Sequence, residues 1–148
     1  MGYTHYWYRK KIIDEDIFKN IVDDFKKLLN KTNIPTLLAD WNGDGEPDID
    51  YTEVRFNGKQ PEDDHETFVF EQNMDIENKI SKEGKYFVFC KTARKPYDIA
   101  VTTFLLIAKY YLGDDIKVSS DGIKEDWNEA DVLVRHILKY DILEEIDL

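Results

Sequence analysis

The sequence has few of the features that mark secreted, membrane-bound or multidomain proteins. Cys90 is its only cysteine, so the chain cannot build the disulfide framework on which small secreted domains depend. The longest apolar stretch, residues 99–112, is interrupted by Thr102, Thr103 and Lys109, and the N-terminus shows no charged and apolar leader. No Gly/Ser-rich linker divides the chain. We therefore expect one compact domain over residues 1–148, located in the cytoplasm and without contact to a membrane.

Positive charge is also scarce. Lys and Arg number 20 against 31 Asp and Glu, which gives a formal net charge of −11 at pH 7. Because binding to phosphate backbones requires clustered Lys and Arg, this balance predicts no direct binding of nucleic acid. An acidic chain can instead imitate DNA and occupy a DNA-binding protein, so an acidic interaction protein or DNA-mimic inhibitor stays open as an alternative.

The sequence lacks the familiar catalytic and metal-binding motifs. It contains no nucleophile elbow, P-loop, dinucleotide fingerprint or metalloprotease motif, and its histidines have no metal-ligand spacing with Cys90 or with each other. Residues 40–48 match the start of a calcium loop, but Tyr51 stands at its last position, where a Glu or Asp is needed. We therefore predict an acidic hairpin turn there, and neither a metal nor a cofactor.

The hydrophobic pattern predicts an α+β fold. Aromatic and polar residues alternate over 1–11, as in a strand with one buried face. After Asp14, a good helix cap, apolar residues recur at helical spacing to about Lys31. Further strands are expected at 36–39, 51–56, 66–70, 86–91 and 116–119, and further helices at 97–112 and 126–140. The simplest architecture is two-layered, with helices packed on one face of a mostly antiparallel sheet.

The segment from Lys91 to Asp98, between a strand and the most apolar helix, contains the main candidate site. Lys91, Arg94 and Lys95 lie close together in an acidic chain, where the N–H groups of a helix start favour an anion. Arg94 could hold a phosphate or carboxylate through two hydrogen bonds, and Thr92 could donate another. The alternative is that these cations form ion pairs with nearby carboxylates.

A second loop, residues 119–122, follows the next predicted strand. If strands 86–91 and 116–119 are parallel, both loops open at the same edge of the sheet, where ligands of open sheets often bind. His5 on the first strand could project into this region as an acid, a base or a hydrogen-bond donor. The alternatives are that the loop is an ordinary solvated turn and that His5 is a histidine whose hydrogen bonds are satisfied in the core or at the sheet edge.

Several of these stretches resemble a family of small proteins encoded by bacteriophages and prokaryotes. The resemblance covers the MGYTHYW N-terminus at 1–7, residues 65–70, the KTxRKPYD motif at 91–98, residues 119–122 and Trp127. This family has no established activity, so the resemblance implies a shared site and supplies no reaction. A phage setting implies interference with host defence.

Together these observations predict a non-catalytic binding protein for a phosphorylated, nucleotide-derived small molecule, which in a phage would sequester a host defence signal. Tyr6, Trp7 and Trp127 are expected to stack on a base. The full set of expected ligand-binding residues is Thr4, His5, Tyr6, Trp7, Lys91, Thr92, Arg94, Lys95, Tyr97, Ser119, Ser120, Asp121 and Trp127. The alternative is a nucleotide phosphodiesterase or hydrolase in which His5, Lys91 and Asp98 are catalytic. A homo-oligomer is compatible with either function.

Overall fold

The computed structural model describes residues 2–148 and has an α+β architecture, as predicted. Its strands are β1 (Thr4–Arg9), β2 (Asp48–Ile49), β3 (Glu53–Phe56), β4 (Phe68–Glu71), β5 (Ser81–Lys82), β6 (Lys85–Lys91) and β7 (Ile116–Ser120). Its helices are α1 (Glu15–Asn30), α2 (Asp98–Leu112) and α3 (Asn128–Leu133), and α3 continues as a π-helical turn over Val134–Leu138. Met1, which the predicted first strand includes, lies outside the described residues.

The strands form two antiparallel sheets. The larger sheet has the order β5-β6-β1-β7, and the smaller has the order β2-β3-β4. Because β1 is antiparallel to both β6 and β7, these two strands are parallel to each other. Taken along the chain, β1-α1-β5-β6-α2-β7 is a split β-α-β arrangement, with the smaller sheet inserted between α1 and β5. The ends of β6 and β7 therefore lie on either side of the start of β1. The segments that follow these two strands thus open at the same edge of the sheet, as predicted for parallel strands.

The two long helices begin and end at the residues that the sequence indicates. The Asp14 side chain accepts hydrogen bonds from the N–H groups of Asp16 and Ile17 and so caps α1. Helix α2 is buried on nearly all sides and ends at Gly113, whose φ of 54° is readily available only to glycine.

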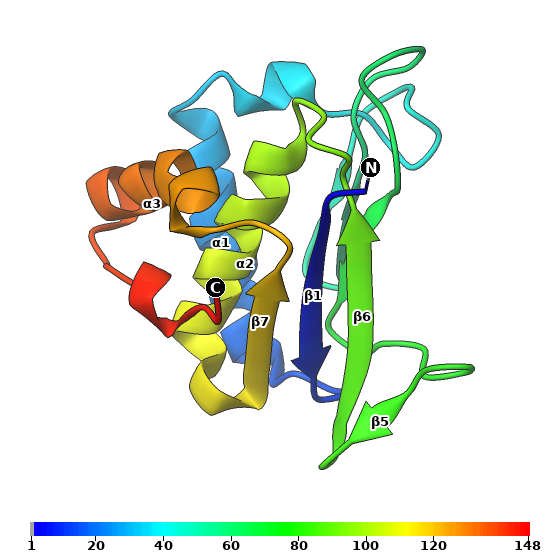
Figure 1. Ribbon diagram of the computed structural model, residues 1–148, viewed down its shortest axis with the longest axis vertical. Coiled ribbons are helices and arrows are strands. Elements are labelled where there is room, and N and C mark those ends of the chain that lie inside the picture. Colours follow the sequence, from blue (N-terminus) through cyan, green and yellow to red (C-terminus); the bar gives the residue numbers. More distant parts are fainter. Residues whose placement is uncertain (1) are drawn as a thin grey trace.

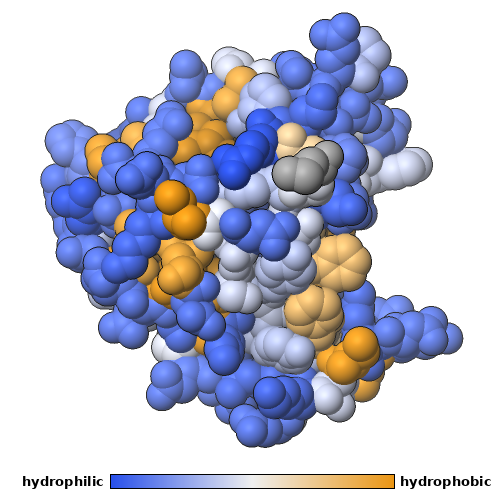
Figure 2. Space-filling model, viewed as in Figure 1, coloured by the Kyte–Doolittle hydropathy of each residue, from blue (hydrophilic) through white to orange (hydrophobic). Residues whose placement is uncertain are grey.

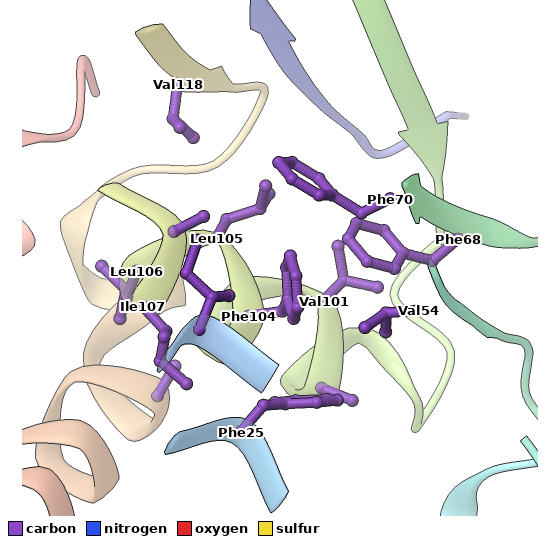
Figure 3. Close-up of a cluster of buried hydrophobic side chains, with 14 of the residues drawn as sticks. Phe25, Val54, Phe68, Phe70, Val101, Phe104, Leu105, Leu106, Ile107 and Val118 are labelled. Carbon is purple, nitrogen blue, oxygen red and sulfur yellow. The ribbon is translucent and has the colours of Figure 1, made fainter. Parts of the chain in front are cut away.

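The helices and the smaller sheet cover one side of the larger sheet (Figure 1). Trp7 of β1 packs against Phe68 of β4, with ring centroids 5.5 Å apart. Phe68 and Phe70 in turn pack against Phe104 of α2 (Figure 3). We call this side of the larger sheet its inner side. The opposite side faces the viewer in Figure 1, and no helix lies over it there.

Two predicted elements differ from the structure. The expected strand at 36–39 is a 3₁₀ helix over Ile34–Leu37, because Pro35 fixes a helical φ at its start, and only Ala39 makes a strand-like bridge, to Asn57. The expected last helix begins as a 3₁₀ helix over Lys124–Trp127 before α3 starts. Within residues 2–148, no helix is both long and apolar enough to cross a membrane.

Candidate functional site

Four side chains form a hydrogen-bonded cluster where β1 begins and where β6 and β7 end. His5 Nδ1 lies 2.8 Å from Ser120 Oγ, and His5 Nε2 lies 2.6 Å from Asp98 Oδ1. The Thr92 hydroxyl donates to the same carboxylate oxygen. We call His5, Thr92, Asp98 and Ser120 the strand-end network. The structure thus joins the first strand, the segment after β6, the first turn of α2 and the end of β7.

His5 is enclosed within this network. Its exposed fraction is 0%, and the rings of Tyr3 and Trp127 stand edge-on to it at centroid distances of 5.1 and 5.2 Å. Both ring nitrogens already have partners. The sequence predicts an anion at the start of α2. In the structure, the carboxylate of Asp98, a residue of the chain itself, lies there. This geometry is that of a satisfied core histidine, one of the two interpretations that the sequence left open.

Arg94 closes the network on the solvent side. Its guanidinium lies over the ring of Tyr3, 3.9 Å from the centroid, and forms a 2.9 Å ion pair with Asp126. The Ile123 N–H and, second, Arg94 lower the pKa of Asp126 below its usual value. Arg94 therefore forms an ion pair with a carboxylate of the chain, which was the alternative to a ligand-binding role. Within residues 2–148, Lys91 and Lys95 form no ion pair.

The turn that carries Arg94 has an unusual backbone. Ala93 and Arg94 have φ values of 52° and 58°, in the left-handed region that costs an ordinary residue roughly 1–2 kcal/mol. The N–H groups of Thr92 and Ala93 both donate to the Tyr3 carbonyl and hold the turn in place. This strained turn directs Arg94 over Tyr3 and away from the sheet.

Tyr3 and Gly122 fit against each other beneath Arg94. A Cβ atom on Gly122 would collide with the Tyr3 hydroxyl, so only glycine leaves room for the ring. Burial, and then the carboxylates of Asp98 and Asp126, raises the pKa of Tyr3 to about 12. Tyr3 is not recognisable from the sequence as a site residue, because the register of three strands determines which residues surround it.

Asp121 ties β7 to β1 next to the network. Its carboxylate accepts hydrogen bonds from the Thr4 N–H at 3.1 Å and from the Tyr6 hydroxyl at 2.9 Å. The hydrogen bond to Asp121 is the main reason that the pKa of Tyr6 is raised. The predicted residues Thr4, Tyr6 and Asp121 therefore do lie together, at the edge of the side that the helices leave uncovered.

Three predicted aromatic residues lie in the core. Trp7, Tyr97 and Trp127 are almost fully buried, and the Tyr97 hydroxyl donates to the Glu66 carbonyl. This differs from the expectation that Trp7 and Trp127 stack on a base. The physical reason is strand alternation: Trp7 follows His5 by two residues, so both point to the inner side.

The uncovered side of the larger sheet has a distinct composition. By strand register and alternation, its outward positions are Thr4, Tyr6, Tyr8, Lys82, Lys85, Phe87, Phe89, Lys91, Lys117 and Ser119. We call these residues the outer face. None of them is acidic, although 31 of the 148 residues of the chain are Asp or Glu. Four aromatic residues and four lysines of an acidic protein thus share a face without acidic strand positions.

The aromatic rings of the outer face form a continuous group. The Phe87 ring lies 6.0 Å from that of Tyr6, 5.1 Å from that of Tyr8 and 6.0 Å from that of Phe89, centroid to centroid. Phe89 is 51% exposed, and hydrophobic side chains are visible along β6 in Figure 2. Beside Phe87 and Phe89 lies a hollow of about 390 Å³. Large exposed apolar side chains that lie together often mark a binding surface.

Acidic residues border the outer face but are already engaged. Asp121 accepts from Tyr6, and Glu66 accepts from the backbone N–H of Lys91. The lysines also have a structural interpretation, because Lys on an edge strand prevents sheets from pairing edge to edge. That interpretation does not explain the exposed ring of Phe89 between them.

Sequence reasoning missed Tyr8, Phe87, Phe89, Lys85 and Lys117 as site residues. The run from Tyr86 to Cys90 is apolar or aromatic at every position, so its period does not tell which side chains face the core. The decisive signal is the pairing of β6 with β1, which sets Phe89 opposite Tyr6.

Nothing in residues 2–148 groups three or more His, Cys, Asp or Glu side chains in a way that could hold a metal ion. Comparisons with known proteins find no matching family model, no matching curated protein and no matching solved structure.

Proposed function

We propose that this chain is a binding protein for a phosphorylated, nucleotide-type molecule, which it holds on the outer face. The observation that carries the proposal is the joint presence of exposed aromatic rings and lysines on a face with no acidic strand position. A nucleotide combines the two chemistries that such a face would attract, a flat aromatic base and an anionic phosphate.

The rings supply the contact for the base. Every nucleobase has a π-face, and stacking on an aromatic side chain is worth about 1–3 kcal/mol per base. Phe89 is the ring with the largest free surface, and Phe87 beside it is in contact with Tyr6 and Tyr8. A base that covers Phe89 would remove exposed apolar surface from water, which is favourable in itself.

Lys91 supplies the contact for the phosphate. It follows Phe89 by two residues on β6, so both side chains are on the outer face. Lys91 forms no ion pair within the described part of the chain, and its aliphatic stem passes Gly2, where a side chain would crowd it. Its ammonium group is therefore available to a ligand.

The geometry favours binding over turnover. The histidine that a phosphodiesterase would use as acid or base, His5, is fully buried, and both of its nitrogens are hydrogen-bonded. The outer face itself carries only Lys, Tyr, Phe, Ser and Thr. We therefore propose that the ligand is held and released unchanged, as in the sequestration that the resemblance to phage-encoded proteins suggests.

The test is thermal unfolding and calorimetric titration with adenosine monophosphate and with a cyclic dinucleotide, at low salt. A ligand at 100 times its dissociation constant adds about 2.7 kcal/mol to the free energy of unfolding. We expect stabilisation of the wild type and a loss of it in Lys91→Gln. Lys27→Gln removes the same charge from an exposed position on α1 and should bind normally. The proposal is overturned if neither of these probes binds and if the longer oligonucleotides hexathymidylate and hexauridylate do not bind either.

A further inference from the structure

The lysines of the outer face are spread over its whole length. Lys85 and Lys91 stand at the two ends of β6, six residues apart. At about 3.3 Å per residue, their Cα atoms are separated by roughly 20 Å. Lys82 lies beside Lys85, and Lys117 lies on the opposite edge strand. One phosphate group cannot contact the cations at both ends at once.

The rings between these lysines also exceed what one base needs. Tyr6 and Tyr8 come from β1, and Phe87 and Phe89 come from β6, which pairs with β1 from Tyr86 to Lys91 and with β5 only at Lys85 and Tyr86. Phe89 lies opposite Tyr6, and Phe87 lies opposite Tyr8. The rings of Tyr6, Tyr8 and Phe89 all contact the ring of Phe87, so the group extends along the strands from Phe89, nearer to Lys91, to Tyr8, nearer to Lys85.

This arrangement matches a chain of linked nucleotides. We propose that the ligand of the outer face is a short single strand of nucleic acid, which places at least two bases on this group of rings and its phosphates along the lysines. The inference rests on the proposed function and names its ligand class. Single-stranded nucleic acid is bound in this way where aromatic side chains on a sheet alternate with cations along the backbone.

The net charge of −11 does not exclude such a ligand. At physiological ionic strength, exposed charges interact over about 8 Å, so a phosphate on the outer face is affected mainly by its immediate neighbours. Those neighbours include the lysines, together with Asp121 and Glu66, whose carboxylates accept hydrogen bonds from uncharged groups, and Glu83, which follows Lys82 in the turn between β5 and β6. The sequence-based prediction against nucleic acid used the total charge, whereas the relevant quantity is the charge of this one face.

The same features disfavour a second copy of the chain as the occupant. In a twofold dimer through the outer face, each surface meets an identical one. The lysines of one copy would then face lysines and aromatic rings, without an acidic strand position to pair with them.

The experiment is calorimetric titration of the wild-type protein with unlabelled hexathymidylate, hexauridylate and thymidine monophosphate at 50 and 200 mM salt. We expect the hexanucleotides to bind at least 100-fold more tightly than the monophosphate. Contacts to about three phosphates predict a slope near −2 for the logarithm of the binding constant against that of the salt concentration, so affinity falls more than ten-fold over this range.

Phe89→Ala should weaken hexanucleotide binding at least ten-fold, because it removes one stacking surface. Trp41→Ala, which removes an exposed ring from a loop outside the outer face, is the matched control and should bind normally. Circular dichroism of both variants verifies that they fold.

The outcomes separate the two proposals. Equal affinity for hexanucleotide and monophosphate, with sensitivity to Phe89→Ala, would overturn the inference of a linked ligand and leave the proposed function standing. Absence of binding to every nucleotide probe would overturn both. Binding to anionic vesicles with no binding to nucleotides, or a concentration-dependent dimer that Phe89→Ala dissolves, would also overturn both, because the face would then serve a membrane or a second copy.

Discussion

Alternate residues of the same strands point to the two sides of the larger sheet, and the two sides differ in how their side chains are buried and hydrogen-bonded. On the inner side of β1, His5 is fully buried and hydrogen-bonded to Asp98 and Ser120. On the outer side of the adjacent strand, Phe89 is 51% exposed. The buried polar groups on the inner side have hydrogen-bond partners, so their burial is tolerated. The apolar rings on the outer side remain exposed, although their burial would stabilise the fold. This contrast supports a structural role for the strand-end network and is the basis for proposing the outer face as the ligand site.

The largest effect should follow from removing the ring beneath the network. Trp127→Ala removes a fully buried ring that contacts His5, so the free energy of unfolding should fall by about 3–5 kcal/mol. Urea denaturation measures this loss. Trp41→Ala, at a position 59% exposed, should change stability by no more than about 0.5 kcal/mol. Equal losses in the two variants would contradict the structural role assigned to the network.

A smaller effect is expected from the central carboxylate. Asp98→Ala leaves His5 Nε2 and the Thr92 hydroxyl without their acceptor, which should cost about 2–3 kcal/mol. Asp98→Asn retains an acceptor and should cost less. If the network served catalysis and not stability, both variants would unfold at the wild-type urea concentration.

Much of the fold is predictable from the sequence because its signals are local. Asp14 and Gly113 mark the boundaries of α1 and α2, and the alternation over 3–9 marks β1. The convergence of segments 91–98 and 119–122 followed from one assumption about strand direction, which the structure meets. The strand expected at 36–39 is the counterexample, because there Pro35 outweighs a short apolar run.

The candidate site is less predictable because it depends on register. The sequence leaves open whether Arg94 binds a ligand anion or forms an ion pair, because its partners Tyr3 and Asp126 are distant in the chain. It selects both Tyr6 and Trp7 for stacking, although only Tyr6 faces outward, and it omits the outward rings of Tyr8, Phe87 and Phe89. A shift of one residue along a strand exchanges its two faces, and only cross-strand pairing fixes which one is exposed.

High pH should loosen the inner side through Tyr3. Its pKa is about 12 in the folded protein and near 10 in the unfolded chain. A raised pKa means that the neutral phenol is favoured by folding, so this stabilisation is complete below pH 10 and is lost as the pH rises toward 12. Thermal unfolding of the wild type and of Tyr3→Phe over this range should show a shallower decline in the variant. Parallel curves would show that Tyr3 ionises with its ordinary pKa.

The smallest effect on binding should come from Arg94. Arg94→Ala breaks an exposed ion pair and a ring contact on the inner side, so stability should fall slightly. Nucleotide binding should remain at the wild-type level, in contrast to Lys91→Gln on the outer face. A loss of binding in Arg94→Ala as large as that in Lys91→Gln would return the ligand site to the strand ends.

The most direct test of the central claim is ¹⁹F NMR of protein labelled with 3-fluorotyrosine, with hexathymidylate added to saturation and resonances assigned by Tyr→Phe variants. The account predicts that the resonances of Tyr6 and Tyr8, on the outer face, shift, while that of Tyr3, on the inner side, does not. A shift at Tyr3 without one at Tyr6 or Tyr8, or no shift at any tyrosine, would contradict it.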